Sequence, residues 1–113
     1  MWLFTKFGFY SIVQDEKEKA LYKVRARKEQ DLQELINEVG DISSNEIHQD
    51  DKADYRYRIF VNGSQLSAIL FALSDSVDYS NFKDSIYKNK KQKDKLSSYH
   101  LVWDVMYEYQ LKN

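Results

Sequence analysis

The chain has 113 residues, of which 42% are hydrophobic and 15% aromatic, and it contains neither cysteine nor proline. This length is typical of a single domain, so we expect one compact domain over residues 1–113. Without cysteine there are no disulfides and no thiol catalysis, which fits a reducing cytoplasm. The first 13 residues include Lys6 and fall short of the roughly 20 apolar residues that span a membrane, so a strand is expected there.

The formal net charge of −1 conceals an uneven distribution of charge. Residues 29–54 contain nine acidic side chains and a single cation, Lys52, whereas residues 88–95 contain five lysines and a single acid, Asp94. Local charge of one sign bears more on the choice of partner than the total does. The simpler interpretation of the lysine-rich stretch is a solvated loop between helices.

Aromatic and β-branched residues predict a first strand over residues 1–13, with a bulge or a close backbone approach at Gly8. The polar residues 14–19 connect it to a second strand over residues 20–27, so the two are expected to form an antiparallel hairpin. Residues 44–49 are a weak strand candidate, followed by an acidic turn over residues 50–54. Residues 54–61 again alternate apolar and cationic side chains and predict a further strand.

Apolar residues at helical spacing predict a helix over residues 29–39, with Asp31 and Glu34 placed as a capping box and Gly40 as the stop. Residues 62–64 form a turn and cap before a second amphipathic helix that ends near Val77. A shorter helix is expected near Ser80. The last helix begins near Asp94 and carries one broad apolar face, formed by Leu96, Tyr99, Val102, Trp103, Met106 and Tyr109.

This order of elements predicts an α+β fold, a two-layer sandwich with additional C-terminal helices. Strand, strand, helix, strand, strand, helix is the order that results when the final strand of a ferredoxin-like unit moves to the front of the chain. In that permuted ββαββα arrangement the second and fourth strands are central neighbours, and the helices cover one face of the sheet. The other face is then open.

The two alternating strands place their cations on this open face, which suits an anion. The candidate ligand-binding residues are Lys23, Arg25, Arg27, Arg56 and Arg58. With Lys6 and an aromatic ring from Trp2, Phe4 or Tyr10, they suit phosphates and a stacked base. The alternative is that these arginines pair with Asp54 and with the acids of the first helix, or are simply solvated.

A second candidate group, Tyr79, Asn81 and Lys83, lies in a polar and aromatic run at a helix junction. These side chains suit a ligand pocket at the edge of the sheet. The simpler interpretation is that Asp78 or Ser80 caps the helix that follows.

No pattern in the sequence indicates catalysis, a metal or a cofactor. His48 and His100 lie on separate elements and match no metal-ligand spacing, and His100 is expected to be a packing residue. The three glycines are too far apart for a phosphate-binding loop. The carboxylates of residues 50–54 lack the glycine and terminal glutamate of a calcium loop.

Several blocks of the sequence together resemble a family of small bacterial proteins of unknown function. They are MWLFT at residues 1–5, GFYSIVQ at 8–14, VRAR at 24–27, DL at 31–32, DYRYR at 54–58, DYSNFK at 78–83 and VW at 102–103. The resemblance implies that the blocks belong to one domain, and it implies no activity. The lysine-rich run at residues 89–95 departs from the pattern.

The sequence favours a cytoplasmic, non-catalytic binding module for nucleic acid or a phosphorylated small molecule. The alternative is a protein-interaction or inhibitor domain that uses the acidic segment 29–54 or exposed aromatic residues, and a homodimer that seals the sheet belongs with it. An enzyme ranks third, because no base with a recognisable partner is visible.

Overall fold

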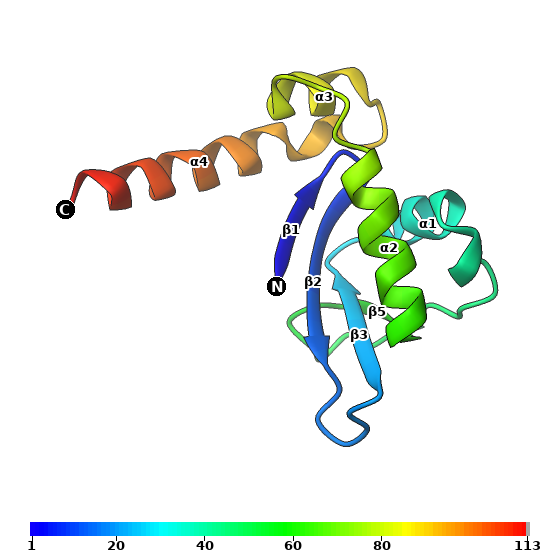
Figure 1. Cartoon of the computed structure of the whole chain (residues 1–113). Coiled ribbons are helices and arrows are strands. Elements are labelled where there is room, and N and C mark those ends of the chain that lie inside the picture. Colours follow the sequence, from blue (N-terminus) through cyan, green and yellow to red (C-terminus); the bar gives the residue numbers. More distant parts are fainter. Residues whose placement is uncertain (113) are drawn as a thin grey trace. The chain divides into compact units, whose positions relative to one another are not determined.

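In a computed structural model, which describes residues 1–112, the chain forms two compact units, Met1–Asp78 and Tyr79–Asn113. The first unit contains a β-sheet with two helices, α1 and α2, and the second unit is helical (Figure 1). The predicted α+β class is therefore confirmed. The expectation of one domain over residues 1–113 stays a prediction.

The sheet of the first unit is antiparallel and has five strands in the order β1-β2-β3-β5-β4. The strands are β1 (Trp2–Thr5), β2 (Gly8–Gln14), β3 (Leu21–Ala26), β4 (His48–Gln49) and β5 (Tyr57–Asn62). The two predicted cationic strands, β3 and β5, are hydrogen-bonded neighbours over six residue pairs, Leu21↔Asn62 to Ala26↔Tyr57. The two strands are therefore adjacent, which the sequence alone left open.

The prediction of a single strand over residues 1–13 was wrong, because this segment folds as the hairpin of β1 and β2. Thr5 Oγ1 accepts hydrogen bonds from the backbone N–H groups of Phe7 and Gly8 and donates one to the carbonyl of Gly8. One side chain therefore closes the turn, which contains no Asn-Gly or Asp-Gly signal. Gly8 is the first residue of β2 and not a bulge; the alternative expected there, a close approach, is present, because Asp31 of α1 packs against this glycine.

Both helices of the first unit pack on the same face of the sheet. They are α1 (Glu29–Glu38) and α2 (Gly63–Asp75), and a 3-10 turn, η1 (Gly40–Ile42), follows α1. The side chains that fill the core come from both helices, from η1, from the C-cap of α1 and from three strands: Tyr10, Ile12, Val24, Ala26, Leu32, Leu35, Val39, Ile42, Ile59, Val61, Ile69 and Leu73. Burial of this apolar surface is the main force that holds the two layers together.

The two helices begin differently. The predicted cap of α2 is present, since Asn62 accepts a hydrogen bond from the backbone of Gln65 and the Gln65 side chain accepts one from Asn62. The predicted capping box of α1 was wrong, because Lys28 is the N-cap and provides no side-chain bond. Asp31 is instead buried, at 1% exposed, and accepts a hydrogen bond from the backbone N–H of Phe9. Its carboxylate therefore joins α1 to β2.

The second unit consists of α3 (Phe82–Lys88), the 3-10 turn η2 (Lys93–Lys95) and α4 (Leu96–Leu111). Asn81 caps α3 by accepting a hydrogen bond from the backbone N–H of Asp84, where the sequence suggested Asp78 or Ser80. No helix in residues 1–112 has both the length and the apolar character needed to cross a membrane.

We predict that Gly8→Ala destabilises the first unit by about 2 kcal/mol or more. The Cβ atom that alanine adds at residue 8 would lie 2.5 Å from Cγ of Asp31. This carboxylate is buried and hydrogen-bonded, so it has little room to move away. Urea unfolding followed by circular dichroism measures the loss. The matched control is Gly63→Ala, where a Cβ meets nothing within 4 Å, and a change within about 0.5 kcal/mol is expected. Equal effects at the two glycines would contradict the proposed clash.

Candidate anion-binding site

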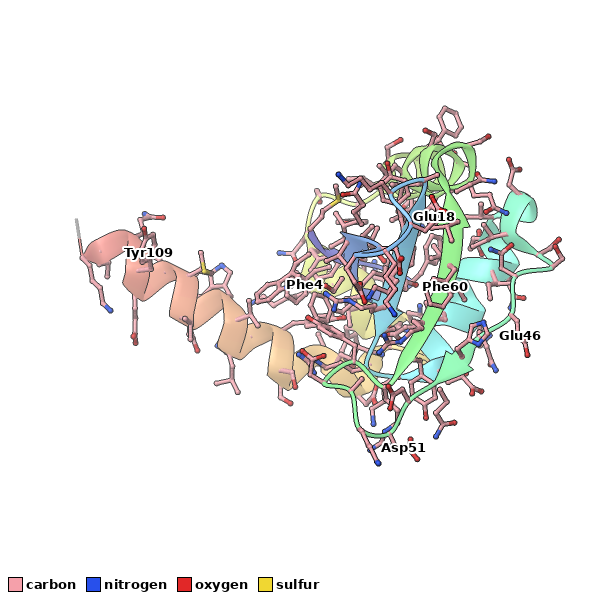
Figure 2. The ribbon with its side chains drawn as sticks, turned by 90° about the horizontal axis from the view of Figure 1, so that it is seen from below. Phe4, Glu18, Glu46, Asp51, Phe60 and Tyr109 are labelled. Carbon is pink, nitrogen blue, oxygen red and sulfur yellow. The ribbon has the colours of Figure 1, made fainter. Side chains whose placement is uncertain are left out.

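The face of the sheet opposite the helices carries the cations of the two central strands. In β3 the buried residues Val24 and Ala26 face the core, so Lys23 and Arg25 point the other way. In β5, Ile59 and Val61 face the core and Arg58 shares the open face with Phe60. Figure 2 labels Phe60 on β5. The sequence pattern therefore predicted the sidedness of both strands correctly.

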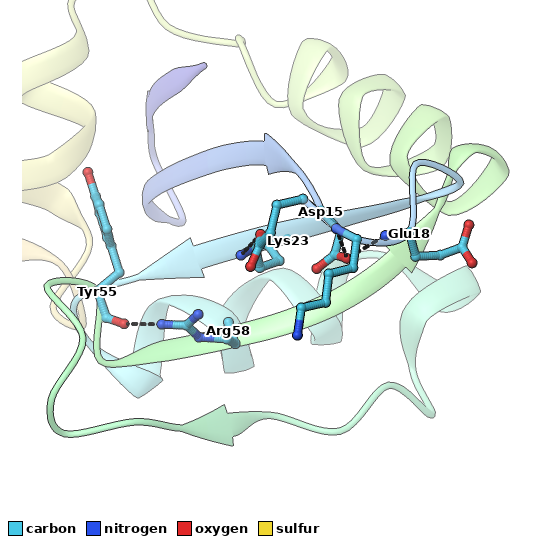
Figure 3. Close-up of polar contacts among 7 residues, drawn as sticks. Asp15, Glu18, Lys23, Tyr55 and Arg58 are labelled. Carbon is cyan, nitrogen blue, oxygen red and sulfur yellow. Dashed lines mark hydrogen bonds and ion pairs between the residues drawn. The ribbon is translucent and has the colours of Figure 1, made fainter.

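Arg25 and Arg58 lie directly opposite each other in the register of β3 and β5. Arg25 Nη2 donates to Oγ of Ser11 at 2.8 Å. Figure 3 shows Arg58, whose Nη2 donates to the carbonyl of Tyr55 at 2.9 Å. The Nε atoms of both arginines are buried and have no hydrogen-bond partner among the described residues. No ion pair joins either guanidinium to a carboxylate within residues 1–112.

Tyr55 contacts both arginines of this pair, Arg25 through its ring and Arg58 through its backbone carbonyl, and sequence reasoning missed its role. Its ring centroid lies 4.6 Å from Cζ of Arg25 and 4.2 Å from Cζ of Arg27, both within cation–π range. Tyr55 is 4% exposed although it precedes β5. Strand alternation placed it on the core side with Tyr57, but the strand begins only at Tyr57, so residue 55 is free to turn to the open face.

Aromatic rings on β1 and β2 extend the site toward one edge of the sheet. Phe4 stacks on Phe9 with centroids 4.4 Å apart, Trp2 meets the edge of Phe9 at 6.2 Å, and Phe9 lies 6.3 Å from Tyr55. We call these four rings, Trp2, Phe4, Phe9 and Tyr55, the aromatic cluster. Tyr10, the third aromatic residue suggested for this face, is instead buried in the core, where its hydroxyl donates to the carbonyl of Asp31.

The other predicted cations have partners of their own. Lys23 Nζ lies 2.7 Å from Glu16, and Arg56 Nε lies 3.5 Å from Asp51 at the tip of the preceding loop (Figure 2). Arg27 Nη1 donates to the backbone carbonyl of Asp54 and not to its carboxylate. Lys6 pairs with Asp78 instead of joining the face. The expected cluster of up to five charges therefore reduces to three arginines without an acid, Arg25, Arg27 and Arg58, of which Arg25 and Arg58 are the directly opposed pair.

The second candidate group belongs to the second unit. Asn81 caps α3, and the ring of Tyr79 lies 5.8 Å from that of Phe82. Lys83 Nζ lies 3.1 Å from Nδ1 of His100 and 5.4 Å from the ring centre of Trp103, so it packs on α4. The simpler interpretation of a helix cap holds for this run, with Asn81 in the capping position.

A shallow groove of about 460 Å³ lies beside α1. It is lined by Glu29, Gln33, Ile36, Asn37, Asn45 and Ile47. Its polar groups are amides and one carboxylate, with no lysine or arginine, so an anion finds no counter-charge in it. The groove therefore does not compete with the arginine pair as an anion site.

Within residues 1–112, no group of three or more histidine, cysteine, aspartate or glutamate side chains is arranged to hold a metal ion. Comparison with models of known protein families, with curated proteins and with solved structures gives no match for this chain. The resemblance to a family of small bacterial proteins stays a prediction. The function must therefore be argued from the geometry of the site.

We predict that the carboxyl pKa of Glu16 lies below its ordinary value, because the carboxylate accepts a hydrogen bond from Lys23. NMR titration of the Glu16 side chain measures this pKa, and in Lys23→Met the pKa should rise toward the ordinary value, with a backbone hydrogen bond and Lys17 still lowering it. Since the folded pKa is lowered, the pair stabilises the fold above the unfolded pKa, and this contribution disappears as the pH falls through the folded pKa. An unchanged pKa in the variant would contradict the pairing.

Proposed function

We propose that the protein is a cytoplasmic, non-catalytic binding module whose open sheet face binds single-stranded nucleic acid or a phosphorylated small molecule. The observation that carries the proposal is the placement of Arg25 opposite Arg58 with no carboxylate on either. Like charges directly opposite each other destabilise a sheet. An anionic ligand supplies the missing counter-charge.

The chemistry of the two side chains suits a phosphate. Each guanidinium has five N–H donors in a planar fork, and here each makes a single hydrogen bond to protein. The Nε atoms of both arginines are buried, so the local dielectric is lower than in water. The electrostatic attraction between the guanidiniums and a bound anion is therefore stronger than it would be in water. Two adjacent forks match the oxygens of one phosphate or of two successive phosphates.

The aromatic cluster favours a ligand that carries a flat ring as well as a phosphate. Trp2 is 69% exposed, and Phe4 stacks on Phe9 beside it. Bases stack on such rings in proteins that bind single strands. The distribution differs from that of common RNA-binding sheets, since here three of the four clustered rings are on β1 and β2 and the opposed arginines are on β3 and β5.

The proposal extends to the finer description of the fold. The order β2-β3-β5-β4, with α1 after β3 and α2 after β5, supports a ferredoxin-like unit whose final strand stands first in the chain. In this description β1 is an additional edge strand. A sheet with one open face is a surface that such folds use for binding, which is an argument from analogy.

We predict that Arg25→Ala and Arg58→Ala each reduce binding of a short single-stranded oligonucleotide at least tenfold. Each change should lower the free energy of unfolding by only about 1 kcal/mol, since relief of the like-charge pair offsets part of the lost contacts. Backbone NMR titration in low and high salt measures the affinity. With two phosphates contacted, affinity should fall roughly 25-fold between 50 mM and 500 mM salt.

The matched control is Arg56→Ala, which removes the same charge from an exposed side chain that pairs with Asp51. It should leave the affinity within about twofold of the parent. A mononucleotide and inorganic phosphate, titrated separately, distinguish a nucleic acid from a small phosphorylated ligand. Equal losses in all three variants, or binding that does not respond to salt, would refute the arginine pair as the site.

A protein-interaction domain is the second candidate, and the exposure of Trp2 favours it. The acidic segment 29–54 is a weaker basis for this function. Asp31 is buried against β2, and Asp51 pairs with Arg56. These two acids of the segment therefore already have partners within the fold. In the NMR titration described above, chemical-shift changes at Trp2 without changes at Arg25 and Arg58 would favour a protein-interaction domain over an anion-binding module.

A further inference from the structure

The register of the sheet aligns one residue from each of the five strands in a single row across the open face. Trp2 of β1 lies opposite Ser11 of β2, and Ser11 lies opposite Arg25 of β3. Arg25 lies opposite Arg58 of β5, and Arg58 lies opposite His48 of β4. Directly paired residues of an antiparallel sheet point to the same face. We call Trp2, Ser11, Arg25, Arg58 and His48 the cross-strand row.

The chemical character of the cross-strand row changes from one edge of the sheet to the other. At the β1 edge, Trp2 presents a ring that is 69% exposed. Ser11 is fully buried and accepts the hydrogen bond from Arg25, so it positions this guanidinium. At the β4 edge, His48 is exposed, and its ring centroid lies 5.5 Å from that of Phe60. No ion pair joins His48 to an acid within residues 1–112.

The length of the row indicates an extended ligand. Neighbouring strands lie about 4.8 Å apart, so the four intervals from β1 to β4 span about 19 Å. Three of these intervals, about 14 Å, separate Trp2 from Arg58. A ligand that reaches the ring, the arginines and the histidine at once must be a chain that carries both flat groups and anions. A peptide that adds to a sheet instead runs parallel to its strands at an edge.

We infer that the cross-strand row binds a single strand of nucleic acid about four nucleotides long, which crosses the sheet at a steep angle to its strands. A base stacks on Trp2, the two arginines hold phosphates at the centre, and protonated His48 holds a further phosphate at the β4 edge. The inference rests on the proposed function and narrows it, because a small phosphorylated molecule cannot reach both ends of the row.

The participation of His48 makes the binding depend on pH. Histidine is the side chain that gains charge between about pH 7.5 and pH 5.5, whereas arginine stays charged throughout. The charged groups around His48 are Arg58, which faces it from β5, and the acids Glu46 and Asp50, each two residues away along the chain. A strand bound to the arginines therefore gains a third cationic contact as the pH falls.

A length series tests the extent of the site. Thymidine monophosphate and thymidine oligonucleotides of two to six residues are titrated into the full chain and followed by backbone NMR. Affinity should rise at least tenfold from one to four residues and change by less than about threefold beyond four. Trp2→Ala should weaken the tetranucleotide at least fivefold and leave the affinity for the monophosphate within about twofold. The spectra of the free variants verify that each keeps its fold.

The matched control for Trp2→Ala is Trp103→Ala. Trp103 is the other of the two tryptophans in the chain, is 53% exposed, and lies on α4 of the second unit. Its removal should leave the affinity for the tetranucleotide within about twofold of the parent. An equal loss in both tryptophan variants would overturn the placement of the base on Trp2.

The salt dependence at two pH values tests His48. Between 50 mM and 500 mM salt, affinity for the tetranucleotide should fall about 25-fold at pH 7.5, as for two phosphate contacts, and about 125-fold at pH 5.5, as for three. In His48→Gln the fall should stay about 25-fold at both pH values, a result that a purely structural role would not give. The matched control His100→Gln removes the only other histidine of the chain and should keep the pH dependence of the parent.

Failure of this inference differs from failure of the proposed function. Salt-sensitive binding that Arg25→Ala removes, with equal affinity for one and four residues and no effect of Trp2→Ala or His48→Gln, would overturn the cross-strand row and keep the arginine pair as an anion site. Absence of binding at every length and pH would overturn both. An oligoglutamate peptide that binds as tightly as the tetranucleotide would overturn the assignment to nucleic acid.

Discussion

The close approach of Gly8 and Asp31 fixes how the sheet and α1 fit together. Asp31 sits on the helix, is almost fully buried, and accepts a hydrogen bond from the backbone of β2. It can do so only because Gly8 has no side chain in the space that the carboxylate occupies. The same glycine begins β2 after the turn closed by Thr5, so one small residue sets both the hairpin and the helix position.

The open face depends on this arrangement. The hairpin places Phe4 against Phe9, and Phe9 then lies near the ring of Tyr55. Tyr55 in turn stacks on Arg25, and its carbonyl accepts a bond from Arg58. The two guanidiniums are therefore supported by an aromatic ring, a hydroxyl and a carbonyl rather than by acids. Such neutral partners hold an arginine in place and leave its charge uncompensated, which is the condition for binding an anion.

Much of the fold could be predicted from the sequence because periodicity shows which side of an element is apolar. The two helices of the first unit, the cationic strands and their sidedness all follow from spacing. The hairpin of β1 and β2 could not be predicted, since its turn relies on the hydroxyl of Thr5 and on space at Gly8. The role of Tyr55 was missed because the alternating pattern of the sequence begins at Asp54, three residues before β5 begins at Tyr57. The exposure of α4 was missed too, since spacing cannot reveal what covers a helix.

Both edges of the sheet are short, which limits how the protein can assemble. On one side β4 has only two residues, and an acidic turn connects it to its neighbour β5. On the other side β1 has four residues and is held to β2 up to the Met1 amino group, which donates to the carbonyl of Ile12. Short or charged edges discourage the addition of a further strand. Uncontrolled sheet-to-sheet aggregation is therefore disfavoured, even though the open face carries exposed aromatic rings.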